Sequence, residues 1–261
     1  MSRSRAAIAF DAGQRWLMLR GLSRVLQLYP VLEYPKSGGS WFAQMLADAL
    51  ELPFPRNRRP PLASCVMHGH HLFHRSFRNV TCVLRDGRDV MVSAYYHFLF
   101  DNDRNQPHFV ARHRDALRFD DYRDIRGNLP SFIDYLFDVD ADRPRHFSWA
   151  EFVESWVAHD VNLVRYEELL EYAAATLGRS VRAMTGRELR AERLADIAAA
   201  YKFENLSRRA PGDENIRSFL RKGVAGDWVN HFSADARSRF CLHAGDALIA
   251  AGYEADRSWA D

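Results

Sequence analysis

Short apolar runs alternate with longer amphipathic segments along most of the chain, and this order limits the fold more than any other feature. Runs typical of buried strands lie at residues 31–34, 64–67, 80–84 and 162–165. Segments with helical spacing lie at residues 40–49, 89–98, 131–137, 149–157, 167–177, 186–200 and 234–251. Because parallel strands need a crossover connection, usually a helix, this order predicts an α/β fold with a mainly parallel central sheet flanked by helices. Ligands bind at the carboxyl ends of the strands in such sheets.

Several of the expected helices carry end signals. Ser40 is a good N-cap for the first of them. Capping boxes at residues 148–151 and 185–188 are expected to open two later helices. Gly252 follows the last helix and is placed to end it as a C′ glycine.

Length and composition favour one globular domain covering residues 1–261. The formal net charge is only +2, so the chain as a whole is too balanced to coat nucleic acid, and we expect no nucleic-acid partner. The three cysteines, Cys65, Cys82 and Cys241, are an odd number without metal-type spacing. Such usage suits a reducing compartment, which predicts a cytoplasmic protein.

The N-terminal segment Gln14–Leu28 mixes apolar residues with Arg15, Arg20 and Arg24. No run of about 18 apolar residues occurs, so a membrane-spanning helix is not expected. A basic amphipathic helix here could make a peripheral contact with a membrane surface. The favoured alternative is a helix packed on the domain's own core.

Residues 101–145 break the alternation of strand and helix, being rich in Asp, Arg, Asn and Pro. We interpret this stretch as a variable excursion from the core. It is expected to act as a lid over a binding site or to face the substrate.

The first motif that carries chemistry is residues 34–41, between an expected strand and an expected helix. Gly38 and Gly39 let the backbone curl so that its N–H groups point inward, and the start of the helix adds partial positive charge. Lys36 adds a full charge, and Ser37 and Ser40 add hydroxyl groups. The loop is a candidate anion cradle, although a structural turn with a solvated lysine would fit it equally well.

Two further motifs offer positive charge. In residues 84–93, Arg85 ends a strand and Ser93 lies about one turn into the next helix, so both could grip one phosphate. In residues 221–228, two adjacent cations are followed by glycines that let backbone amides approach an anion. Taken singly, a surface Arg–Asp network and a solvated basic loop are the alternative interpretations.

Together the three motifs resemble those of the PAPS-dependent sulfotransferases of the cytosolic type, PAPS being 3′-phosphoadenosine-5′-phosphosulfate. The family's Tyr-Pro-Lys-Ser-Gly-Thr-Thr-Trp loop matches residues 34–41, with Gly39 and Ser40 in place of both threonines. Its Arg-x-x-x-Asp-x-x-x-Ser pattern, continued by Tyr-Tyr-His-Phe, matches residues 85–98. Its Arg-Lys-Gly-x-x-Gly-Asp-Trp signature matches residues 221–228 without a break.

The resemblance implies a P-loop-like nucleotide site and transfer of a sulfuryl group from PAPS to an acceptor hydroxyl or amine, which releases PAP. Lys36 would stabilise the leaving phosphate, and the loop from Ser37 to Trp41 would hold the 5′-phosphate. Tyr166, at the end of the fourth strand, would contact the adenine. The cofactor-binding residues implied in this way are Lys36, Ser37, Gly38, Gly39, Ser40, Trp41, Arg85, Ser93, Tyr166, Arg221, Lys222 and Gly223.

A general base must take the acceptor's proton, and histidine titrates closest to neutral pH. The family carries a Lys-x-His pair after its second strand, and the best register places His68 at the lysine and His70 at the base. Either His68 serves as a weaker cation or Lys36 acts largely alone. His71 is the alternative base if the register slips by one residue. No carboxylate or cysteine lies next to these histidines in the sequence, so we expect no metal site and no metal requirement.

Two other functions stay open. A catalytically silent module could keep the PAPS or PAP site without transfer, since the family lysine and both threonines are replaced. A P-loop nucleotide kinase fits less well, because residues 34–41 lack its Gly-x-x-x-x-Gly-Lys-Ser/Thr pattern. The acceptor is left as a small molecule or a glycan, and the oligomeric state is left open.

Overall fold

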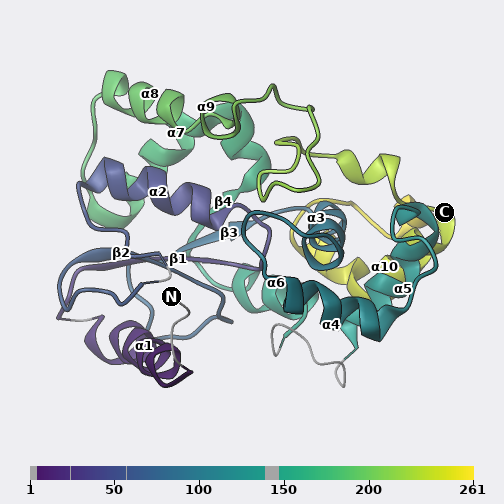
Figure 1. Cartoon of the computed structure of the whole chain (residues 1–261). Coiled ribbons are helices and arrows are strands. Elements are labelled where there is room, and N and C mark those ends of the chain that lie inside the picture. The colour runs from purple at the N-terminus through teal and green to yellow at the C-terminus, as the bar shows by residue number, and fades with distance from the viewer. Residues whose placement is uncertain (1–4, 24, 57, 139–146) are drawn as a thin grey trace. The chain divides into compact units, whose positions relative to one another are not determined.

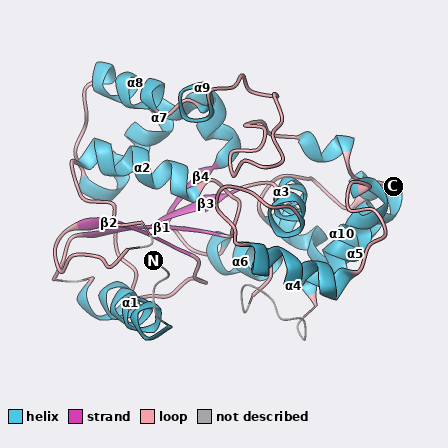
Figure 2. Cartoon of the chain, in the orientation of Figure 1, coloured by secondary structure: helices cyan, strands magenta, loops and turns pink. Residues whose placement is uncertain are grey.

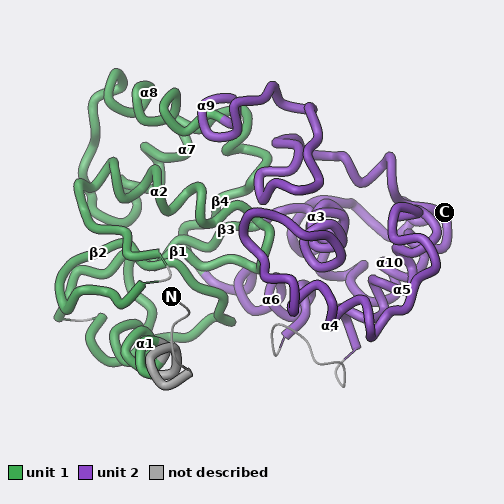
Figure 3. Tube along the Cα trace, in the orientation of Figure 1, with its two compact units in different colours: residues 1–84, 160–202 green, residues 85–159, 203–261 purple. Residues whose placement is uncertain are grey.

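The computed structural model describes residues 5–23, 25–56, 58–138 and 147–261. The chain forms two compact units (Figure 3), and each is described by itself. Unit 1 comprises residues 1–84 and 160–202, and unit 2 comprises residues 85–159 and 203–261. That all 261 residues form a single domain stays a prediction.

A four-stranded parallel sheet forms the centre of unit 1 (Figure 2). Its strands are β1 (Leu28–Glu33), β2 (Cys65–Gly69), β3 (Thr81–Leu84) and β4 (Asn162–Arg165), in the order β2-β1-β3-β4. Each pairing is parallel, so the four carboxyl ends meet at one edge. The predicted fold class is therefore confirmed, and all four expected strands are present.

Strand β1 begins three residues earlier than the sequence pattern suggested. Pro30 hid this extension, because proline has no N–H to donate and is disfavoured inside sheets. Pro30 pairs with Met67 of β2, whereas the ladder between β1 and β3 starts only at Val31. The proline is tolerated because it precedes the part of β1 that is paired on both sides.

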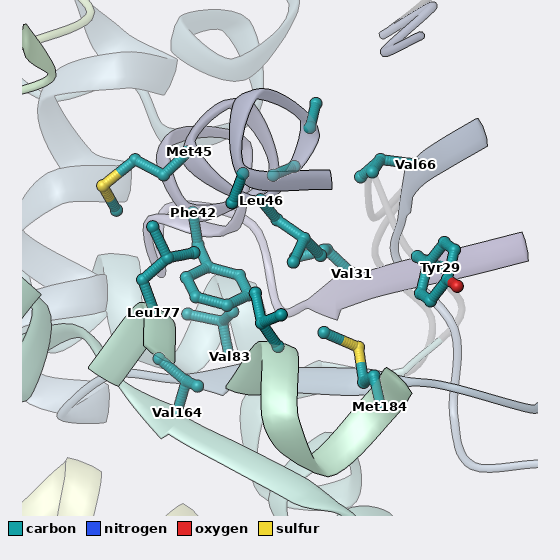
Figure 4. Close-up of a cluster of buried hydrophobic side chains, with 14 of the residues drawn as sticks. Tyr29, Val31, Phe42, Met45, Leu46, Val66, Val83, Val164, Leu177 and Met184 are labelled. Atoms are coloured by element: carbon teal, nitrogen blue, oxygen red, sulfur yellow. The ribbon is translucent and has the colours of Figure 1, made fainter. Parts of the chain in front are cut away.

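Helices lie on both faces of this sheet (Figure 1). The helical elements of unit 1 are α1 (Arg5–Leu17), the π-helical turn η1 (Met18–Leu22), α2 (Gly39–Leu50), α7 (Tyr166–Thr185) and α8 (Ala191–Ala200). Helices α2, α7 and α8 lie on one side of the strands, and α1 lies on the other. The hydrophobic core between α2, α7 and the sheet (Figure 4) contains Phe42, Val31 and Val83, all fully buried. Burying such a side chain contributes roughly 1.5–3 kcal/mol.

The expected helix over residues 14–28 is only partly present. Helix α1 ends at Leu17, and Leu28 is already the first residue of β1. Gly21 lies in the turn between them, and glycine weakens a helix interior. Trp16 and Leu17 are exposed, whereas Met18 of η1 is buried, so the segment splits between the surface and the core.

The expected helix over residues 186–200 also starts later, at Ala191. Gly186 adopts φ 69° and ends α7, which therefore extends through Thr185. The Thr185 hydroxyl donates back to the Val181 carbonyl instead of capping a new helix. The predicted capping box at residues 185–188 is wrong, because a left-handed glycine stops a helix more strongly than a nearby box starts one.

The regular elements of unit 2 are all helical among its described residues. Its helices are α3 (Gly87–Leu99), α4 (Pro107–Leu117), α5 (Ile125–Phe137), α6 (Trp149–Val157), α9 (Phe203–Ser207) and α10 (Ala234–Ala250), with 3-10 turns η2 (Asp227–Asn230) and η3 (Ser258–Ala260). The capping box at Ser148 and Glu151 is confirmed, as is Gly252 with φ 70° after α10. A Cβ at Gly87 would come within 2.6 Å of the Phe240 ring, so only glycine lets α3 begin there.

Helices α4 and α5 lie within the excursion expected over residues 101–145, of which residues 139–146 are outside the described part. Its role as a lid or acceptor-facing region stays a prediction. Among the described residues, no helix has both the length and the apolar composition needed to cross a bilayer.

Candidate active site

The loop that follows β1 has the backbone of an anion cradle. Lys36 and Gly38 both adopt left-handed conformations, with φ 75° and 90°. Such a conformation is unusual for lysine, and together the two residues curl the backbone of the loop. The Ser37 hydroxyl is buried and has no hydrogen-bond partner among the described residues. A buried polar group without a partner is rare in a folded protein, so this hydroxyl is suited to a ligand.

Helix α2 starts one residue earlier than expected, at Gly39, so the prediction of Ser40 as its N-cap is wrong. Gly38 precedes the helix and has no side chain with which to cap it. The Glu33 carboxylate caps it instead, because Glu33 Oε2 accepts a hydrogen bond from the Gly39 N–H at 2.6 Å. One of the amides expected to hold phosphate is thus already used inside the protein. Two more amides expected to hold phosphate are also used inside the protein, because the Ser37 N–H donates to the Tyr34 carbonyl at 3.2 Å and the Trp41 N–H donates to the Gly38 carbonyl at 3.0 Å.

Tyr166, the first residue of α7, packs on the same loop. A Cβ built on Gly38 would lie 2.6 Å from the Tyr166 ring, so glycine is required there by space as well as by conformation. Trp41 meets Tyr166 edge to face at 6.0 Å, and its indole N–H donates to the Tyr201 carbonyl at 2.8 Å. Two residues predicted to bind the nucleotide, Trp41 and Tyr166, are therefore neighbours.

The two histidines at the end of β2 both bind Glu33, the last residue of β1. His68 Nε2 lies 2.7 Å from Glu33 Oε1, and His70 Nδ1 lies 2.9 Å from the Glu33 carbonyl oxygen. A carbonyl can only accept, so His70 Nδ1 donates to it. Donation from Nδ1 is what a general base needs if Nε2 is the nitrogen that takes the acceptor's proton.

Burial of Glu33 opposes its ionisation, but the hydrogen bond from His68, the positive charges of His68 and His70 and the Gly39 N–H outweigh that effect. Its pKa is therefore lowered, and the group is held as a carboxylate. The negative charge of Glu33 has a second consequence on β3. Burial and this charge together raise the pKa of the Cys82 thiol well above its usual value.

Glu33, His68 and His70 offer ligand atoms that all lie within 4.8 Å of one another. The expectation that no carboxylate lies beside the histidines is therefore wrong, because residues distant in sequence meet across neighbouring strands. Such a set has the donor chemistry of a zinc site. However, both Glu33 carboxylate oxygens already accept hydrogen bonds from protein donors, so the cluster is satisfied without an ion.

In unit 2 the second and third motifs are joined by Asp89 of α3. The Asp89 carboxylate accepts from the backbone N–H groups of Gly226 at 2.7 Å and Trp228 at 2.9 Å. Arg85, which directly follows β3 in the chain, donates to the Val224 carbonyl at 3.3 Å and lies 3.6 Å from Asp89. Burial of Asp89 raises its pKa, although Arg85 and the two amides act in the opposite direction. The structure thus brings these two motifs together.

The cations of the third motif are held by a second carboxylate, Asp227. Arg221 Nη2 lies 2.7 Å from Asp227 Oδ2, and Lys222 Nζ lies 2.6 Å from Oδ1. Arg221 also pairs with Glu214 and lies over the Tyr96 ring at 4.7 Å. Although burial opposes ionisation of Asp227, hydrogen bonds from His231, Lys222 and Arg221 lower its pKa strongly.

Gly223 and Ser93 complete the predicted set in this unit. Gly223 has φ 68°, and a Cβ there would lie 2.4 Å from the Phe203 ring, so the loop cannot carry a side chain at this position. Ser93 lies half-buried in α3, four residues beyond Asp89.

Unit 1 therefore gathers the loop from Lys36 to Trp41 with Tyr166, and it places His68 and His70 on Glu33. Sequence analysis missed the parts played by Glu33 and Asp227. Both carried a signal that could have been used. Glu33 is an acidic residue at the end of an otherwise apolar strand, and Asp227 lies within six residues of two adjacent cations.

Asp227 makes the stability of the fold sensitive to acid. Its pKa is lower in the folded chain than in the unfolded one, so its ion pairs stabilise the fold above pH 4 and are lost as the pH falls below it. We expect the free energy of unfolding to decrease between about pH 5 and pH 2. Asp227→Asn should make that decrease shallower in urea titrations, whereas the exposed control Asp235→Asn should not. An identical slope for Asp227→Asn and the wild type would contradict this account.

Comparison with known proteins gives a consistent family. A family model described as the sulfotransferase domain matches residues 52–248. Sulfotransferase 1E1 of Cavia porcellus is 24% identical over 82% of this chain and 80% of its own length. Sulfotransferase 2A6 of Mus musculus is also 24% identical, over 80% of each chain.

Solved structures share the fold. Mouse sulfotransferase SULT7A1 complexed with PAP has a TM-score of 0.59 and 17% identity, covering 87% of this chain and 89% of its own. Retinol dehydratase in complex with androsterone and inactive cofactor PAP has a TM-score of 0.56 and 16% identity, over 93% and 85% of the two chains. With the family model covering most of the residues and all three sequence motifs present, this chain belongs to the sulfotransferase family of enzymes.

Proposed function

We propose that this enzyme transfers the sulfuryl group of PAPS to a hydroxyl of a small-molecule acceptor. The observation that carries the proposal is the loop after β1, where the buried Ser37 hydroxyl has no partner among the described residues and lies between two left-handed residues. An anion bound there would satisfy the hydroxyl and would lie at the start of α2, where the helix adds partial positive charge. The PAP complexes of the structural neighbours support the choice of nucleotide.

Within unit 1, the chain's own groups have separate tasks. The loop from Ser37 to Trp41 holds the 5′-phosphate end of the nucleotide. Lys36 neutralises the oxygen that leaves as the S–O bond to the phosphate breaks, and PAPS supplies the sulfuryl group. Tyr166, packed against Gly38, offers its ring to the adenine.

Unit 2 is assigned the 3′-phosphate, with Arg85, Ser93 and residues 221–223 as its ligands. Carboxylates already hold Arg221 and Lys222. A guanidinium has five N–H donors and an ammonium has three, so each keeps donors for a phosphate while Asp227 fixes its position.

His70 acts as the general base. As the acceptor oxygen forms its new bond to sulfur, the acceptor's proton passes to His70 Nε2, and the electron pair of the breaking S–O bond leaves with PAP. No metal is needed in this sequence, because positioning and charge stabilisation suffice for in-line transfer. Among the relatives are hydroxysteroid sulfotransferases of Cavia porcellus, which supports a hydroxyl on a small molecule over a glycan or an amine.

The remaining alternatives are a silent module that only binds PAP or PAPS and a nucleotide kinase. Incubation with 35S-labelled PAPS and a panel of phenols, sterols and aliphatic alcohols, with and without EDTA, tests the proposal. Labelled product formed equally in both conditions is expected. Tight PAP binding by calorimetry with no product from any acceptor would favour the silent module, and transfer only from ATP would favour the kinase.

Lys36→Ala should lower the single-turnover rate with labelled PAPS by about 100-fold, which corresponds to about 3 kcal/mol of lost charge stabilisation. Some PAPS affinity should be lost as well, because the lysine belongs to the loop that holds the phosphate. The exposed Lys202→Ala is the matched control and should behave as the wild type. A rate unchanged by Lys36→Ala would remove the lysine from the mechanism.

His70→Ala should keep PAP affinity within about threefold while turnover falls by two to four orders of magnitude, since a general base acts on the acceptor and not on the nucleotide. His71→Ala is the control at the neighbouring position and should retain turnover. The reverse result, with His71→Ala inactive and His70→Ala active, would assign the role of general base to His71 instead.

Two predictions about location remain. The cytoplasmic assignment is supported by Cys65, Cys82 and Cys241, which are all buried and unpaired as thiols. The predicted peripheral membrane contact is supported by Trp16 and Leu17, about half of whose surface is exposed.

Trp16→Ser/Leu17→Ser should reduce co-sedimentation with phosphatidylserine vesicles by about tenfold, because the apolar contact is lost while the basic residues stay. Leu242→Ser, on an exposed face of α10, is the control and should leave binding unchanged. A wild-type chain that stays in the supernatant would exclude the contact.

A further inference from the structure

Glu33 is a buried carboxylate of unit 1 that touches several parts of the candidate site. It is the last residue of β1 and only 4% exposed. Through its carboxylate and its carbonyl it contacts the start of α2 at Gly39, His68 of β2 and His70, which directly follows β2. No motif predicted from the sequence includes it, so its position at the carboxyl edge of the sheet needs its own explanation.

The space at Gly39 is set by Glu33. A Cβ built on Gly39 would lie 2.8 Å from Glu33 Cδ, 2.9 Å from Cγ and 3.0 Å from Cβ. Contacts that short force one side chain to move, so residue 39 can be larger only if Glu33 shifts or is replaced. This explains why a glycine stands at the place of the first of the two threonines in the resemblance described above.

Glu33 also contacts His68. The hydrogen bonds and charges around Glu33 lower its pKa, so a partner of opposite charge is favoured beside its buried carboxylate. His68, whose side chain is 8% exposed, lies with Nε2 2.7 Å from Glu33 Oε1, where the carboxylate would balance a positive charge on the ring. Because Nε2 donates to Glu33, Nδ1 is the nitrogen through which His68 can act on a ligand.

The two departures from the family motifs, Gly39 and His68, are thus adjacent to one side chain. A glycine leaves the space that Glu33 fills, and a histidine contributes the ring nitrogen that hydrogen-bonds with its carboxylate. Independent changes at two positions would not be expected to produce this match in both volume and hydrogen bonding.

We propose that Glu33, Gly39 and His68 act as one unit, in which Glu33 is a positioning residue that holds His68 as the second cation facing the departing phosphate. The inference rests on the proposed function. It resolves the alternatives left open for His68 in favour of a working cation, so Lys36 does not act alone. His68 donates from Nδ1 to the oxygen of the breaking S–O bond and keeps its proton, and Glu33 neither gains nor loses one.

The first test separates positioning from nucleotide binding. Glu33→Gln keeps the size of the side chain but removes its charge, and we expect kcat to fall by about 100-fold while KM for PAPS and the Kd for PAP stay within about threefold. The exposed Glu188→Gln, also in unit 1, is the matched control and should leave all three constants unchanged. A normal kcat for Glu33→Gln, or a loss confined to PAP affinity, would overturn the proposal.

The second test is a rescue. Gly39→Thr alone should lower both stability and kcat, because the threonine collides with Glu33. Glu33→Ala/Gly39→Thr should recover the stability, since the threonine fills the space that Glu33 leaves. Adding His68→Lys should then recover about tenfold or more in kcat, because the ammonium needs no carboxylate to stay charged. If the fold-changes in kcat of the single substitutions simply multiply in the combined variants, the three positions act independently and are not one unit.

A third measurement does not depend on turnover. In ring-labelled protein, 15N NMR should show a hydrogen-bonded His68 Nε2 whose shift changes in Glu33→Gln and stays unchanged in Glu188→Gln. If the wild type makes no sulfated product but this signal changes as expected, the proposed function fails and the Glu33–His68 pair stands. If transfer occurs and the signal does not change, or if EDTA abolishes transfer because Glu33 and His68 serve as metal ligands, the inference fails and the function stands.

Discussion

A carboxylate buried at the end of the central strand β1 sets the geometry of unit 1. Without partners, the ionised Glu33 would cost more than most single side chains contribute to stability. Its three partners come from two different segments, namely the start of α2 at Gly39, and His68 and His70 at the end of β2. The contacts of its carboxylate and its carbonyl together therefore fix the spacing between the anion-binding loop and the candidate base.

In unit 2, two buried acidic residues position the groups of the candidate site. Asp89 accepts from two backbone amides of the third motif, and Asp227 pairs with the cations of that motif. In both cases an acidic residue inside a basic motif organises the positive groups instead of cancelling them. Asp227 pairs with both Arg221 and Lys222, so its carboxylate offsets their mutual repulsion.

The fold could be predicted from the sequence because parallel strands leave a strong local signal. The runs at β2, β3 and β4 are apolar and short, and only the extension of β1 through Pro30 was concealed. Helix ends were harder. The capping box predicted at Ser148 does begin a helix, α6. At Gly186, in contrast, a positive φ that no local pattern reveals ends α7, and the next helix begins later than predicted.

The candidate site could be predicted only as far as its motifs are contiguous. Residues 34–41 and 221–228 could be recognised as loops that bind anions, but their internal partners come from other segments. That Glu33 meets His68 depends on the register between β1 and β2, in which Val31 lies opposite His68. A one-residue slip would turn either side chain to the other face of the sheet, so no local pattern could supply that pairing.

The replacement of a lysine by a histidine paired with a buried acid changes more than the identity of one cation. A lysine carries its charge on a flexible chain, whereas the imidazole ring of His68 is fixed at Nε2 by Glu33, and only Nδ1 remains to act. Fixing the ring reduces the entropy lost when the transition state forms, but it ties catalysis to the position of β1. Selection at residue 39 then follows from packing alone, since any side chain there would displace the carboxylate on which the histidine depends.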